Sequence, residues 1–235
     1  MKLKILEVLP NNVKELAERI EEYSGTKIGI TDKMDQRLIK NVNSPALAIT
    51  INEKKADLVI LDKTKYNAQS VLHELLHLER FWIKGIPQFI AKDDKNQHLT
   101  STIDNQIEHI FIVPEEEKYG YERYSYWNEV YRESFSKFPP KDIQMFSLKG
   151  QCIFGLIHSK ILVNDKNIQS LITSKIRDVG LLQFSKNAER FLMKNINDKE
   201  KTIKAIVSIL EIPIKDVQLK YIDIKNRKAI YKEIS

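Results

Sequence analysis

The sequence predicts an α+β protein in which a small mixed sheet packs on two helices, followed by a mainly helical C-terminal part. Two features lead to this fold class. Short runs rich in Ile, Leu and Val, typical of strands, lie before residue 62, and longer runs with helical spacing follow residue 67. Strands that precede helices along the chain are typical of the α+β class.

The N-terminal segment is predicted to form one helix and three strands. Apolar residues recur at helical spacing in Val13–Tyr23. The predicted strands are Lys27–Ile30, Ala46–Asn52 and Ala56–Leu61, with the polar turn Glu53–Lys55 between the last two. A polar link, Asp62–Tyr66, connects them to the next helix.

A central helix is predicted over Ala68–Trp82. Asn67 suits the N-cap position, because its side-chain oxygen can accept a backbone N–H of the first turn. No Pro or Gly interrupts the run, and Gly85 and Pro87 follow its end. Apolar residues occupy nearly the whole circumference, which predicts a buried helix: Val71, Leu72, Leu75, Leu76, Leu78, Phe81 and Trp82.

The rest of the chain is predicted to be mainly helical. A second helix covers Thr100–Val113 and ends at Pro114. Further helices are predicted over Tyr121–Phe138, Ile143–Val163, Lys166–Arg177, Lys186–Met193 and Lys199–Leu210, and a terminal hairpin over Gln218–Ile224 and Ala229–Ile234. The pair Pro139–Pro140 predicts a boundary between a domain of residues 1–140 and a C-terminal part of residues 141–235.

Composition narrows the class of protein. The chain has 235 residues, of which 42% are hydrophobic, and this is enough for one substantial core. The net charge of +6 is a mild excess that neither indicates nor excludes nucleic-acid binding. Cys152, the only cysteine, lies in an apolar run and is expected in the core, and such usage indicates a reducing compartment. No segment is typical of a signal peptide or a membrane span, so we expect a cytoplasmic protein.

The segment His73-Glu74-Leu75-Leu76-His77 carries the clearest chemistry. The two histidines are one helical turn apart on one face, so both can bind one metal ion. Zinc suits this pair, and Glu74 lies beside the open coordination position where a water binds. The alternative is a histidine pair hydrogen-bonded in a core, but burial of these groups costs free energy unless a partner satisfies them. The pattern therefore favours a zinc site.

A catalytic zinc site generally has a third protein ligand, which the second helix can supply. Asp104 and Glu108 are four residues apart and share a face of that helix. We expect Glu108 to bind zinc and Asp104 to hold a ligand histidine by its other ring N–H, and the reverse assignment is the alternative. His109 points about 100° away from Glu108 and is expected to support the site or to act as an alternative ligand.

These residues together predict peptide hydrolysis. Zinc lowers the pKa of a bound water toward ~7, and Glu74 acts as general base and later protonates the leaving amine. A donor must stabilise the oxyanion, and the sequence leaves five open, which are His109, Tyr119, Tyr121, Tyr124 and His158. Because Ala56–Leu61 directly precedes the motif helix, we expect it to be an edge strand that an extended peptide joins. A protein or peptide is the expected substrate.

The motif and the order of elements resemble the zincin architecture and, within it, the intracellular ImmA/IrrE-type metallopeptidases. The matching residues are His73, Glu74 and His77, followed by the apolar run Ile110–Val113 and then Pro114 and Glu115. The resemblance covers roughly residues 1–120. It implies a zincin-like core and a cytoplasmic zinc peptidase that cleaves a specific regulator, often a transcriptional regulator bound to DNA.

Two other interpretations stay open. A zincin-like core can serve as a binding or regulatory protein with little or no turnover, whose basic C-terminal part recognises a protein or nucleic-acid partner. The motif can also hold a structural metal or form a satisfied polar core. The metal content of the protein and the effect of Glu74→Gln on cleavage distinguish these interpretations.

Overall fold

The computed structural model describes residues 9–31, 47–60, 67–94 and 96–234. Within these ranges the protein is α+β, with two small sheets and a majority of helix, as predicted. The chain divides into two compact units. Unit 1 comprises Met1–Pro87 and Lys220–Tyr231, and unit 2 comprises Gln88–Leu219 and Lys232–Ser235. The proline pair at residues 139 and 140, where the sequence predicts a boundary, therefore falls inside unit 2.

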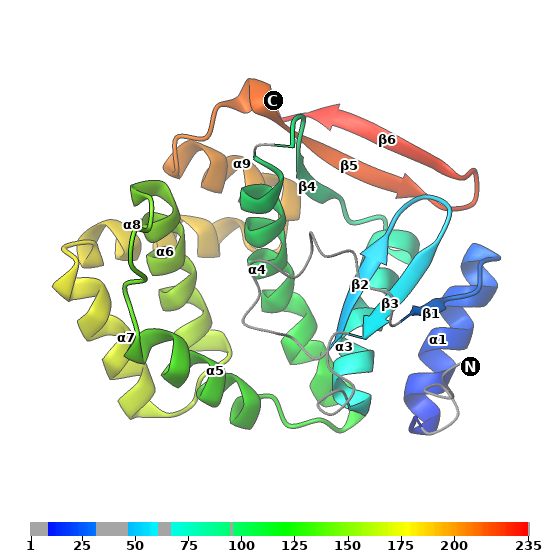
Figure 1. Cartoon of the computed structure of the whole chain (residues 1–235), viewed down its shortest axis with the longest axis horizontal. Coiled ribbons are helices and arrows are strands. Elements are labelled where there is room, and N and C mark those ends of the chain that lie inside the picture. The colour runs from blue at the N-terminus through cyan, green and yellow to red at the C-terminus, as the bar shows by residue number, and fades with distance from the viewer. Residues whose placement is uncertain (1–8, 32–46, 61–66, 95, 235) are drawn as a thin grey trace. The chain divides into compact units, whose positions relative to one another are not determined.

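Unit 1 holds a mixed sheet and the motif helix (Figure 1). Its elements are α1 (Asn11–Ser24), β1 (Gly29–Thr31), β2 (Leu47–Ile51), β3 (Ala56–Ile60) and α3 (Ala68–Leu78). The strand order is β1-β3-β2, with β1 parallel and β2 antiparallel to β3. Strands β2 and β3 contact α3, and so does α1. The small mixed sheet on the motif helix is thus confirmed, while the predicted link 62–66 and Ala46 lie outside the described residues.

The position of β3 corrects one prediction. The order of segments along the chain predicts that Ala56–Leu61 is an edge strand, but β3 lies in the middle of its sheet. Leu58, for example, is paired with Ile30 of β1 on one side and with Ile49 of β2 on the other. Position along the chain does not determine the neighbours of a strand, because pairing with β1 and β2 is made by residues from separate segments. An added peptide strand cannot pair with β3.

The motif helix begins as predicted and ends differently. The Asn67 side chain accepts the Ser70 N–H at 2.9 Å, and the Ser70 hydroxyl accepts the Asn67 N–H at 2.9 Å. This capping box starts α3. The α-helix ends at Leu78 and continues as a π-helical turn, η2 (Glu79–Ile83), where the sequence predicts one unbroken α-helix. Gly85 then adopts a left-handed conformation with φ of 62° and ends the helical segment.

Unit 2 is mainly helical (Figure 1). Its helices are α4 (Gln97–Glu116), α5 (Tyr124–Ser136), α6 (Met145–Ile161), α7 (Lys166–Asp178), α8 (Leu182–Asn195) and α9 (Lys199–Ile209). Each overlaps a predicted helix, with ends that differ from the predicted ones by up to four residues. Helix α4 is longer than predicted because Pro114 lies in its last turn, where the missing N–H removes only one terminal hydrogen bond. Apolar side chains of α5, α6 and α7 form a buried core, including Trp127, Cys152 and Ile172.

A second sheet has the strand order β4-β5-β6. Its strands are β4 (Gln88–Ala91), β5 (Val217–Asp223) and β6 (Lys228–Glu233). Strands β5 and β6 are the predicted terminal hairpin, whereas β4 is too short for its pattern to predict it. In the hairpin turn, Arg227 donates to the carbonyl oxygens of Ser24 and Gly25, both at 3.3 Å, within unit 1. Among the helices of the described ranges, none is long and apolar enough to cross a membrane.

Candidate metal centre

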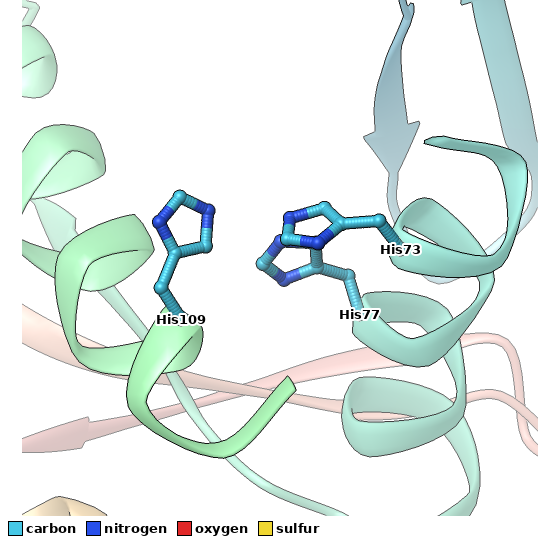
Figure 2. A group of neighbouring side chains, drawn as sticks. All are labelled: His73, His77 and His109. Carbon is cyan, nitrogen blue, oxygen red and sulfur yellow. The ribbon is translucent and has the colours of Figure 1, made fainter. Parts of the chain in front are cut away.

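Helix α3 presents the two motif histidines on one face. The rings of His73 and His77 meet edge to face, with centroids 5.1 Å apart. Figure 2 shows both imidazoles extending to the same side of α3 from successive turns. Leu72, Leu75 and Leu76 cover the remaining faces of the helix and are at most 1% exposed. Their burial fixes the rotation of α3 within unit 1, and with it the direction of the histidine face.

Glu74 follows His73 by about 100° around the helix. The side chains of both residues are partly exposed, whereas His77 is buried. A general base must be reached by the water that it deprotonates, and partial exposure of Glu74 meets this requirement. The two imidazoles and the carboxylate between them are thus arranged as the sequence predicts within α3.

The π-helical turn after α3 adds a contact to the site that the sequence does not predict. The ring of Phe81 is stacked on that of His77, with centroids 6.1 Å apart and an interplanar angle of 23°. In the same turn, the buried carboxylate of Glu79 pairs with Arg19 of α1 and, at 2.7 Å, with Lys84. These ion pairs hold η2 in place, and η2 in turn holds Phe81 against His77.

Asp104 and Glu108 lie on the same face of α4, in unit 2, as their spacing predicts. The Nζ of Lys199, in the first turn of α9, lies 2.7 Å from a carboxylate oxygen of each. The Glu108 side chain is fully buried and that of Lys199 is 2% exposed. Asp104 also accepts the backbone N–H of Phe89 in β4 at 2.9 Å. Burial raises the pKa of Asp104, and the Lys199 charge opposes the rise.

These contacts form a buried ion network that joins α4, α9 and β4 within unit 2. The assignment of Glu108 as third zinc ligand, with Asp104 in support, stays a prediction. The network indicates a different role, which is to fix α4 in its place in unit 2. Sequence reasoning missed Lys199 because a lysine in the first turn of a charged helix normally lies in solvent.

His109 extends from α4 (Figure 2). It follows Glu108 by one residue, about 100° around the helix. Its ring meets that of Trp127 edge to face, with centroids 4.9 Å apart. The His158 ring is tilted by 45° to that of His109, at a centroid distance of 6.4 Å. The side chain of His109 is 8% exposed. Aromatic neighbours therefore hold the orientation of this imidazole within unit 2.

His158 does not fit the role of oxyanion donor. It lies on α6 and is fully buried. Its Nδ1 is hydrogen-bonded to the Tyr131 hydroxyl, and its Nε2 lies 2.9 Å from the Gln106 carbonyl oxygen, so both ring nitrogens are engaged inside unit 2. Burial lowers the pKa of His158 to about 4, which keeps the ring neutral.

The three tyrosine candidates for the oxyanion donor lie close together along the chain. Tyr119 ends the short 3₁₀ turn η3 (Glu117–Tyr119), Tyr121 follows it, and Tyr124 begins α5. All three tyrosines are partly exposed and stay candidates for the oxyanion donor.

Cys152 lies in the core, as predicted, and burial raises the pKa of its thiol to about 12. A thiol with such a pKa is not a nucleophile at neutral pH.

The donor set on α3 fits a zinc ion. Neutral imidazoles are common zinc ligands, and a pair one turn apart on a helix can bind the same ion. The chain has no significant match among protein-family models, curated proteins or solved structures. The zincin-like core and the resemblance to ImmA/IrrE-type peptidases stay predictions.

Proposed function

We propose that the protein is a zinc-dependent metallopeptidase that cleaves an intracellular protein or peptide. The observation that carries the proposal is the pair His73 and His77 on one face of α3, with the partly exposed Glu74 between them. This residue set at this helical spacing is that of zinc hydrolases that use the glutamate as general base. The buried apolar faces of α3 support it, because they keep the three side chains in one orientation.

We assign the third zinc ligand to His109 in place of Glu108. Catalytic zinc sites generally have three protein ligands, and α4 carries the remaining candidates. Glu108 is fully buried and paired with Lys199, so binding zinc through its carboxylate would disturb an ion pair inside unit 2. His109 offers an imidazole whose orientation is held by Trp127. A ligand with a fixed ring orientation needs little reorganisation to bind metal.

In the proposed reaction, Glu74 moves the protons. A bound zinc ion supplies the Lewis acid that polarises the scissile carbonyl and lowers the pKa of the attacking water. Glu74 accepts a proton from this water while the oxygen bonds to the carbonyl carbon. The same carboxyl then gives the proton to the amine nitrogen as the C–N bond breaks. One peptide bond and one water become a carboxylic acid and an amine.

Strand β2 is the proposed binding edge for the substrate. Since β3 is central, it cannot take a further strand, but β2 lies at the border of its sheet. Within the described part of the chain, β2 pairs with β3 on one side only. It also contacts α3 in the same unit. An extended peptide could add to this edge by main-chain hydrogen bonds, which favours a protein or peptide substrate. A transcriptional regulator as substrate and a cytoplasmic location belong to the same proposal.

The experiment compares zinc content and cleavage in matched variants. Purified protein is analysed for metal by mass spectrometry and incubated with a proteome-derived peptide library, whose products are sequenced. Wild type should contain about one zinc per chain and cleave peptides. Glu74→Gln should retain zinc but cleave about 10²- to 10⁴-fold more slowly, because only the general base is removed. Full activity of Glu74→Gln, or wild type without zinc after growth in zinc-rich medium, would overturn the proposal.

The third ligand is tested in the same assay. His109→Ala should lower the zinc content, whereas Glu108→Gln should retain zinc if it retains its fold. The reverse pattern would return the role to Glu108. A protein that holds zinc but cleaves no peptide in the library would favour the alternative of a zincin-like binding protein.

A further inference from the structure

Helix α8, located in Figure 1, lies in unit 2 and has one buried face and one exposed face. Its buried face consists of Ser185, Ala188, Glu189 and Leu192. The opposite face carries Lys186, Arg190 and Lys194, which are all exposed. Successive cations are four residues apart, so a rise of 1.5 Å per residue places them about 6 Å apart along the helix. The three side chains form a regular row of positive charge.

Two exposed apolar side chains flank this row. Phe191 is 53% exposed and Met193 is 37% exposed. At about 100° per residue, the order around the helix is Met193, Lys186, Arg190, Lys194 and Phe191, within an arc of about 160°. The cations therefore occupy the middle of the exposed face, with an aromatic ring at one margin. We call these five residues the α8 face.

The three cations of the α8 face have no acidic partner among the residues that the structure describes. Some other surface cations of unit 2 do have one: Arg132 pairs with Glu129, Lys137 with Glu133, and Lys201 with Asp198. The single acidic residue of α8, Glu189, is turned inward and pairs with Lys160 of α6. The sequence of α8 thus concentrates positive charge on one face without local neutralisation.

We propose that the α8 face binds single-stranded nucleic acid. A chain of phosphates carries negative charge at regular intervals, which complements a regular row of cations. Exposed aromatic rings beside a basic track stack on unpaired bases, and Phe191 has this position. An acidic protein would offer no planar base for the ring, and α8 lacks the broad apolar face of a membrane-binding helix. The net charge of +6 adds to the attraction.

The test measures binding of fluorescein-labelled 20-nucleotide dT and U oligomers to the full chain by fluorescence anisotropy across a salt series. The wild type should bind both, with an affinity that falls linearly on a log–log plot against salt. The triple variant Lys186→Gln/Arg190→Gln/Lys194→Gln should lower the magnitude of that slope by about 2, because each lost phosphate contact contributes about 0.7 for a single strand. Phe191→Ala should weaken binding about tenfold while the slope stays the same.

The matched control is Arg132→Gln/Lys137→Gln/Lys201→Gln, which changes the net charge equally at paired surface sites of unit 2. It should retain most of the wild-type slope. His73→Ala should bind the oligomers as the wild type does, so the result is separable from the outcome of the zinc experiment. Equal slopes for the two triple variants would overturn the proposal. Absence of binding at low salt, or tighter binding of poly-glutamate or anionic vesicles than of the oligomers, would overturn it too.

Discussion

Helices α3 and α4 both carry polar side chains among buried apolar neighbours, but their units accommodate these groups differently. In unit 2, the carboxylates of Asp104 and Glu108 share the ammonium of Lys199, so the protein itself supplies the opposite charge. In unit 1, α3 presents two imidazoles on one face, with Phe81 stacked on His77. Carboxylates neutralised by an internal lysine hold helices together, whereas paired imidazoles are donors suited to a metal. The carboxylates of α4 therefore stabilise the fold, whereas the imidazoles of α3 are proposed to bind a metal.

The largest expected effect is loss of metal from α3. His73→Ala should reduce the zinc content from about one ion per chain to none that is detectable. Because His73 is partly exposed, the free energy of unfolding measured in EDTA should change by no more than about 0.5 kcal/mol. His98→Ala, at an exposed histidine of α4, is the control and should retain zinc. If His73→Ala unfolded on purification, α3 would carry a structural site instead of a functional one.

The next effect concerns the ion network of α4. Lys199→Met removes the cation and leaves two buried carboxylates, which should lower the free energy of unfolding by about 3–5 kcal/mol in urea denaturation. Lys201→Met is the control, because Lys201 is exposed and pairs with Asp198, the N-cap residue of α9. This control should cost no more than about 0.5 kcal/mol. Equal losses in the two variants would show that the network does not hold α4.

The free energy of unfolding should also depend on pH, because His158 is buried in unit 2. Burial lowers its pKa to about 4 in the folded protein, against about 6.5 when unfolded. Between these values the unfolded chain binds more protons, so stability should be full above pH 6.5 and fall as the pH drops toward 4. The loss attributable to this group is about 3 kcal/mol. His158→Gln should flatten the pH dependence of urea unfolding, whereas His98→Gln should leave it unchanged.

The smallest effect compares the starts of the two helices. Asn67→Ala removes the side-chain cap of α3 and should cost about 1 kcal/mol in thermal or urea unfolding. Asn96 occupies the same position before α4 but makes no side-chain cap. Asn96→Ala should therefore change the free energy of unfolding by no more than about 0.5 kcal/mol. If Asn96→Ala lowered the free energy of unfolding as much as Asn67→Ala, the loss in Asn67→Ala could not be attributed to the side-chain cap of α3.

Most helices and the terminal hairpin were predicted from the sequence because interactions between residues a few positions apart determine them. The capping box at Asn67 and the apolar spacing of α1 and α5 to α9 depend on residues a few positions apart, and these helices overlap their predicted ranges. The same holds for the terminal hairpin. Prediction was wrong where the outcome depends on distant residues or on geometry within one turn. These cases are the central position of β3, the π-turn after Leu78 and the continuation of α4 through Pro114.

The sequence by itself determined the donors on α3. A helical period places His73 and His77 on one face whatever surrounds them, and the apolar residues around them predict a buried helix. Only the tertiary structure decided the surroundings of the carboxylates on α4. Helix α9 brings Lys199 to Asp104 and Glu108 within unit 2, and no local pattern encodes that contact. Spacing along one helix is set by the backbone, whereas partners from distant segments are set by packing of the whole unit.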